Sequence, residues 1–152
     1  MYTELALNVT LRPDTPAEVI AVLQYMAGIG DEPAVKPGHE FFDASRWPVL
    51  FICGSAYFDN LQGRPLMERD EYTGNWQLRS WANLKNYDGE IEKFADWIAP
   101  YVATDHPAGW QRHEEAFSPT ILLFHSGRAH WLFSKQLDES VEQLMWPTPA
   151  PN

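Results

Sequence analysis

The chain opens with a regular alternation of apolar and polar side chains, with leucine or valine at every odd position from 5 to 11. A period of two is typical of a β-strand that has one face in a hydrophobic core. Thr15 and Glu18, with a proline between them, predict a capping box at the start of a helix. Apolar side chains at 19, 22, 23 and 26 have helical spacing, and Gly28 predicts the helix end.

The middle of the chain predicts a loop and then a hairpin. Residues 28–48 are rich in glycine and proline. The apolar run at 49–53 predicts either a buried strand or a short buried helix, because periodicity does not separate the two over so few residues. Residues 64–70 and 75–85 predict two strands joined by a four-residue loop at 71–74 that ends in glycine.

A second helix is expected to begin after Asp88, which we assign as its N-terminal cap. Its apolar stripe is formed by positions 91, 94, 95 and 98, and the proline at 100 predicts its end near residue 99. Glu90, Glu92 and Asp96 lie mostly off this stripe. We therefore expect them to form a solvated acidic face.

Three further strands are predicted at 110–117, 120–124 and 129–133, followed by a short helix before the C-terminus. The order of the elements predicts an α+β fold. We expect a ferredoxin-like split β-α-β arrangement with additional antiparallel hairpin strands and with the helices on one face of the sheet. The expected organisation is a single domain over residues 1–146 and a disordered, proline-rich tail at 147–152.

Composition and charge narrow the range of functions. The chain has 152 residues, 45% of them hydrophobic, and a formal net charge of −10. The acidic excess argues against direct nucleic-acid binding, because such proteins concentrate lysine and arginine on one face. The single cysteine excludes an intrachain disulfide. The polar N-terminal segment and the lack of a long apolar run lead us to expect no signal peptide, no membrane contact and a cytoplasmic location.

The sequence contains no recurrent motif for catalysis, phosphate binding or zinc binding. Cys53 follows an apolar run, which favours a buried and unreactive thiol over a nucleophile. The nearest candidates for metal ligands are His125 with His130, and residues 113–115, but neither group has the pattern of a known zinc, iron or calcium site. We therefore expect no catalytic residue, no metal and no cofactor.

The strand at 75–85 carries the most informative pattern. One of its faces is mainly apolar, whereas the other holds a tryptophan among polar side chains: Gln77, Arg79, Trp81, Asn83 and Lys85. On the strand at 110–117, Trp110 and Arg112 likewise share one face. Because tryptophan and arginine are enriched among binding hot spots, we assign a partner- or ligand-binding site on the open sheet face. Its residues are Arg79, Trp81, Asn83, Lys85 and Arg112.

One structural alternative would remove this site. The segment 28–62 would fold over Trp81 and bury it within the monomer, and the out-of-phase tryptophan would then be a core residue. The two arrangements differ in the exposure of a single side chain.

The run Asn83-Leu84-Lys85-Asn86-Tyr87-Asp88-Gly89-Glu90-Ile91-Glu92-Lys93-Phe94, with Trp97 and Pro100-Tyr101 after it, resembles a segment of small uncharacterised proteins of phages and their bacterial hosts. The resemblance covers about 20 residues. It implies a phage-related setting, and it carries no assigned activity and no catalytic residue.

Three hypotheses about function remain from the sequence. The first is a non-catalytic acidic accessory or regulatory protein that binds another protein, either one with a basic surface or a second copy of this chain. The second is that the chain binds a small anionic ligand through the arginines of the open sheet face. The third is a hydrolytic enzyme with His113 or His125 as its base, which rests only on the titration range of histidine.

Overall fold

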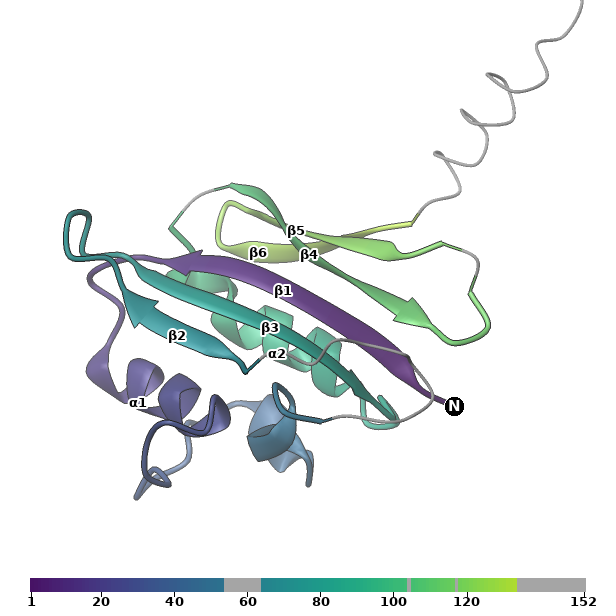
Figure 1. The fold of residues 1–152 in the computed structure, drawn as a ribbon, viewed down its shortest axis with the longest axis horizontal. Helices are drawn as coiled ribbons and strands as arrows, with labels where there is room; N and C mark the ends of the chain where they lie inside the picture. The colour runs from purple at the N-terminus through teal and green to yellow at the C-terminus, as the bar shows by residue number, and fades with distance from the viewer. Residues whose placement is uncertain (54–63, 104, 117, 134–152) are drawn as a thin grey trace, which may run out of the picture.

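The computed structural model describes residues 1–53, 64–103, 105–116 and 118–133 (Figure 1). These residues form a mixed α+β structure with one six-stranded sheet, two α-helices and three short 3-10 helices. In chain order the elements are β1 (Thr3–Leu11), α1 (Ala17–Met26), η1 (Glu40–Asp43), η2 (Trp47–Val49), β2 (Leu66–Arg69), β3 (Trp76–Leu84), α2 (Glu90–Ile98), η3 (Ala99–Tyr101), β4 (His106–His113), β5 (Thr120–His125) and β6 (Arg128–Leu132).

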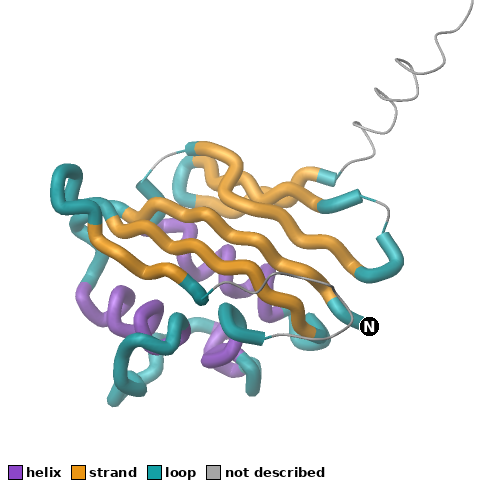
Figure 2. Tube along the Cα trace, viewed as in Figure 1, coloured by secondary structure: helices purple, strands orange, loops and turns teal. Residues whose placement is uncertain are grey.

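The strands lie in the order β2-β3-β1-β4-β5-β6, and every neighbouring pair is antiparallel. β1 lies between β3 and β4, so that Leu5 is opposite Ala82 on one side and Gln111 on the other. Figure 2 shows the helices gathered on one side of the sheet. We call this the helical side and the opposite surface the open face. No helix among the described residues is long and apolar enough to cross a membrane.

The core lies between the sheet and the helices, as the periodicities predict. The apolar positions of β1, α1, α2 and β5 that the pattern assigns to it are all buried in one cluster: Leu5, Leu7, Val9, Val19, Leu23, Phe94, Ile98 and Leu122. These side chains confirm the expected phase of the two helices and of both strands. The expected helix at 137–144 and the tail at 147–152 lie outside the described residues.

The segment after α1 contributes much more to the core than its loop-like composition predicts. Phe41 and Phe42 are buried and make ring contacts with Trp97, at centroid distances of 5.9 and 4.9 Å. Trp47 packs against both phenylalanines. The run at 49–53 is neither a strand nor a regular helix, because the 3-10 helix η2 passes directly into a turn. This segment covers the helical side of the sheet.

Both predicted helix caps are wrong in detail. Thr15 donates its hydroxyl to the carbonyl of Arg12 (2.7 Å), and Pro16 occupies the N-cap position of α1 without a side-chain cap. At α2 the N-cap is a glycine, and the amide of Ile91 is capped by the side chain of Asn86 (3.0 Å) in place of Asp88. The loop before α2 brings Asn86 close enough to take this position.

Two tight backbone features set the geometry of the last three strands. The β5–β6 turn has positive φ at Ser126 (51°) and Gly127 (71°), which matches the twist of a two-residue hairpin. In β4 the pairing with β5 is irregular between Pro107 and Gly109. A Cβ atom at Gly109 would lie 2.1 Å from the carbonyl oxygen of Ala6, so only glycine fits against β1 there.

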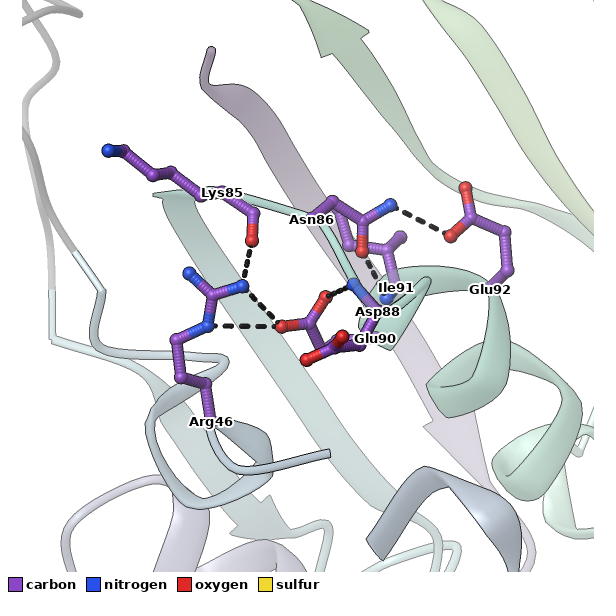
Figure 3. A network of polar contacts seen from close by, with 7 residues as sticks. All are labelled: Arg46, Lys85, Asn86, Asp88, Glu90, Ile91 and Glu92. Atoms are coloured by element: carbon purple, nitrogen blue, oxygen red, sulfur yellow. Dashed lines mark hydrogen bonds and ion pairs between the residues drawn. The ribbon is translucent and has the colours of Figure 1, made fainter. Parts of the chain in front are cut away.

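The acidic residues of α2 do not all form the solvated face that we expected. Glu90 has no exposed surface, and its Oε1 accepts hydrogen bonds from the Nη2 and Nε atoms of Arg46 at 2.7 and 3.1 Å (Figure 3). Its Oε2 accepts from the amide of Asp88 (3.1 Å), and Arg46 also donates to the carbonyl of Lys85. The pair therefore joins the residue before η2 to the first turn of α2.

The core assignment predicts the effect of truncating Phe94. This side chain is 1% exposed and its ring contacts Phe41, Phe51 and Trp97. The Phe94→Ala substitution should lower the free energy of unfolding by about 3–5 kcal/mol, as measured by urea denaturation. A loss below about 1 kcal/mol would contradict the docking of α2 described above.

The buried ion pair predicts an asymmetry between its two partners. Arg46→Met leaves the Glu90 carboxylate buried without its cation, which should destabilise folding by about 3–5 kcal/mol. Glu90→Gln leaves a guanidinium that is 31% exposed and still hydrated, with an amide oxygen as acceptor, so the loss should be about 1 kcal/mol. Equal losses in urea denaturation would contradict this account.

Candidate partner-binding surface

The alternation of side chains along β1 sorts the residues of the sheet between its two faces. Odd positions of β1 point into the core, and even positions lie on the open face. The strand register then places the neighbouring side chains of β3 and β4 on that face. The residues so placed are Glu4, Ala6, Asn8 and Thr10 from β1, Gln77, Arg79, Trp81 and Asn83 from β3, and Trp110 and Arg112 from β4.

An apolar row crosses the open face at right angles to the strands. Ala6 is opposite Trp81 in β3 and Trp110 in β4. Trp110 is in turn opposite Ile121, and Ile121 is opposite Leu132 at the β6 edge. We call these five side chains the apolar row. Its two ends are exposed, Trp81 by 41% and Leu132 by 50%, so the row forms a surface that solvent reaches.

A buried carboxylate holds the tryptophan end of the row in place. Glu4 is 5% exposed, and its Oε1 accepts a hydrogen bond from the indole Nε1–H of Trp81 (2.8 Å). Its Oε2 forms an ion pair with Arg112 (3.1 Å). The Trp81 ring also contacts Trp110 edge-on, with 6.4 Å between centroids. Trp81 is thus oriented before any partner binds, which lowers the entropy lost on association.

The register places four of the five predicted site residues on the open face, whereas Lys85 follows the end of β3, and the five differ in accessibility. Arg79 is exposed and forms no hydrogen bond or ion pair with any described residue. The Lys85 ammonium lies over the rings of Tyr2 and Tyr87, 5.3 and 5.9 Å from their centroids. Asn83 is 1% exposed, so its side chain does not reach the surface.

The segment 28–62 does not bury Trp81 with its described part. Up to residue 53 this segment packs on the helical side, where the carbonyl of Phe51 accepts a hydrogen bond from the hydroxyl of Ser80 (3.1 Å). The carbonyl of Cys53 accepts from the amide of Asn83 (3.1 Å). Residues 54–62 of this alternative lie outside the described part of the chain.

The residues that we considered for catalysis and metal binding lie at separate places in the described part of the chain. Cys53 is half-buried, and burial raises the pKa of its thiol, which disfavours the reactive thiolate. His125 pairs with Asp105 (2.9 Å) at an exposed turn, and its ring lies 6.3 Å from that of His130. Within the described residues, no group of three or more histidine, cysteine or acidic side chains is placed to hold a metal ion.

Several parts of the molecule that bear on binding were not predicted from the sequence. Trp110 follows the same alternation as Arg112 and could have been assigned to the site from that signal. The contacts of Glu4 with Trp81 and Arg112 depend on the pairing of β1 with β3 and β4, which the sequence pattern does not show.

Two cavities also lie on the helical side. One has a volume of about 530 Å³, is mostly apolar and lies between α1 and residues 33–37. The other is polar, has a volume of about 300 Å³ and lies beside α2.

No protein-family model, curated protein or solved structure matches this chain. The function is therefore argued from the geometry of the described residues. The resemblance of residues 83–94 to phage and bacterial proteins stays a prediction.

The buried amide of Asn83 predicts an unusual stability change. Neither its Oδ1 nor its Nδ2 has a hydrogen-bond partner among the described residues. Removing this amide from water therefore lowers the stability of the fold, because no hydrogen bond replaces those to water. Asn83→Leu should leave the free energy of unfolding unchanged or raise it by about 1 kcal/mol. Gln77→Leu is the matched control, because the Oε1 of Gln77 accepts from the Thr10 hydroxyl (3.0 Å). That variant should lose about 1 kcal/mol. A clear loss with Asn83→Leu would mean that this amide is paired.

Proposed function

We propose that this chain is a non-catalytic protein-binding factor that contacts its partner through the open sheet face. The observation that carries the proposal is the apolar row from Trp81 to Leu132, which is exposed at both ends and contains two tryptophans. Contiguous apolar side chains on a sheet face, flanked by polar ones, are typical of protein interaction sites. Buried aromatic anchors at such sites contribute a large part of the binding energy.

We also infer a ferredoxin-like split β-α-β arrangement for the first four strands. β1 and β2 both run antiparallel to β3, which lies between them, and α1 connects them. In the same way β3 and β4 flank β1 and are connected by α2. The β5–β6 hairpin extends this sheet at one edge. An arrangement with both helices on one side leaves the other sheet face available for a partner, which supports the proposed contact surface.

The distribution of charge indicates the chemistry of the partner. Most of the exposed acidic side chains among the described residues lie on the two helices and the loops around them: Asp14, Glu18, Asp31, Glu32, Glu40, Asp43, Asp88 and Asp96. Four others, Glu68, Glu71, Asp105 and Glu115, lie on or beside the strands. The open face presents Arg79 beside the apolar row and Glu68 on β2, while Glu4 is buried and already paired. The partner is accordingly a protein with an apolar surface and a carboxylate opposite Arg79. A basic partner suits the helical side better.

The same contacts weaken the alternative of a small anionic ligand. That hypothesis needs the guanidinium groups of Arg79 and Arg112 together. Arg112 already pairs with Glu4, and an anion bound there would approach the Glu4 carboxylate. A protein partner that covers the apolar row does not need to bind Arg79 and Arg112 together.

The proposal predicts the position of intermolecular cross-links. Asn8 is exposed on the open face, opposite Arg79 and outside the apolar row. A photo-crosslinking amino acid at Asn8, in cells that naturally express the protein, should give a discrete adduct with another protein. The same amino acid at Tyr72, which is fully exposed in the β2–β3 turn, should not. An adduct with the mass of two copies of this chain would identify a homodimer and contradict a separate partner.

The partner so identified allows a quantitative measurement. Trp81→Ala should weaken its binding by about 2 kcal/mol, or about 30-fold in Kd, because it removes an oriented aromatic anchor. Tyr72→Ala is the matched control and should leave Kd unchanged. Thermal denaturation of both variants reports whether they stay folded. An unchanged Kd with Trp81→Ala, or the absence of an adduct at position 8, would contradict the proposed function.

A further inference from the structure

The polar cavity of about 300 Å³ lies on the helical side, away from the apolar row. It is bounded by the first residue of β1, the end of β4, the start of β5 and the first turn of α2. The side chains that carry the argument are Thr3, Asn86, Glu92, Gln111, His113 and Thr120. Among the described residues, no lysine or arginine belongs to its lining. The cavity is separate from the proposed protein-binding surface.

The carboxylate of Glu92 is held in a fixed orientation at the cavity. Its Oε2 accepts a hydrogen bond from Asn86 Nδ2 (2.8 Å), as Figure 3 shows, and its Oε1 accepts from Gln111 Nε2 (2.7 Å). The two donors come from the loop before α2 and from β4. Each carboxylate oxygen keeps capacity for a further hydrogen bond, so Glu92 offers two adjacent acceptors with a defined geometry.

The cavity also has hydrogen-bonding groups that the described residues do not use. Thr3 is 7% exposed, and its hydroxyl has no hydrogen-bond partner among the described residues. The hydroxyl lines the cavity and is therefore available for a hydrogen bond to a bound molecule. The Nδ1 of His113 accepts from the amide of Glu115 (3.3 Å), so the neutral imidazole carries its proton on Nε2 and is a donor there.

This mixture of groups selects one class of ligand. An anion would meet the Glu92 carboxylate without a cation to balance it. An ammonium group would balance the charge of Glu92, but it has only donors and would leave the His113 donor without an acceptor. A hydroxyl group both donates and accepts, and two neighbouring hydroxyls match the two acceptors of Glu92.

We propose that the cavity beside α2 binds a neutral polyhydroxylated molecule of monosaccharide size, with a pair of adjacent hydroxyl groups on Glu92. Its volume lies at the lower end of the range for small-molecule sites. Thr3 and His113 supply further hydrogen bonds to the bound molecule.

The test is a nuclear magnetic resonance titration of the full chain with glucose, galactose, mannose, ribose and myo-inositol. Each is added up to about 50 mM, a concentration that saturates a site with a Kd of about 1 mM. Propylamine and acetate are the charged controls. At least one polyol should give saturable shifts in the amide signals of residues 3, 92 and 111–113. The amide signals of the apolar-row residues should not shift with the same titration curve.

Two substitutions on β1 make the test specific. Thr3→Val removes the unpaired hydroxyl with little change in volume and should weaken polyol binding by at least about fivefold. Thr10→Val is the matched control on the open face of the same strand and should change Kd by less than about twofold. Thr120→Val provides a second cavity variant if Thr3→Val does not fold.

Three results would overturn the inference. The first is the absence of saturable shifts with every polyol. The second is binding that the cavity variants leave unchanged. The third is tighter binding of propylamine or acetate than of any polyol, which would assign the cavity to a charged ligand.

Discussion

β1 is hydrogen-bonded along both of its edges, and the register of these two pairings determines the rest of the structure. Leu5 lies between Ala82 and Gln111, and Ala6 lies between Trp81 and Trp110. A shift of one residue in either pairing would exchange the core face and the open face of a strand. The burial of the leucines of β1 therefore also sets the alignment of the apolar row. Core and candidate surface are two consequences of a single register.

The two faces of the sheet are completed in different ways. On the helical side, α1, α2 and the segment up to residue 53 enclose a core in which Phe41 and Phe94 have about 1% exposure or less. The ion pair between Arg46 and Glu90 connects that segment to α2. On the open face, the β1, β3 and β4 side chains are covered by no described helix, and Glu4 binds Trp81 and Arg112 within the sheet itself. The aromatic surface around Trp81 is accessible because α1, α2 and the segment up to residue 53 all pack on the helical side.

The candidate surface and the polar cavity lie back to back on the same strands. Thr3 lines the cavity, whereas the next residue, Glu4, holds the tryptophan on the open face. In β4, Gln111 contacts Glu92 at the cavity, and Arg112 contacts Glu4. The alternation of a strand separates two binding surfaces by one residue while keeping both in a rigid, hydrogen-bonded sheet. A ligand on one side and a protein on the other would not compete for space.

The sequence by itself determined that β1, β3, α1 and α2 form and which of their residues face the core, because alternation and helical spacing are local patterns. It also placed Arg79, Trp81 and Arg112 on a common face. Only the tertiary structure decided that Glu90 is buried against Arg46, 44 positions away, and that Glu4 orients Trp81, 77 positions away. The same holds for the aromatic packing of residues 41–47 and for the cavity. Such pairings depend on which elements meet in space, and no periodicity along the chain encodes a contact between distant segments.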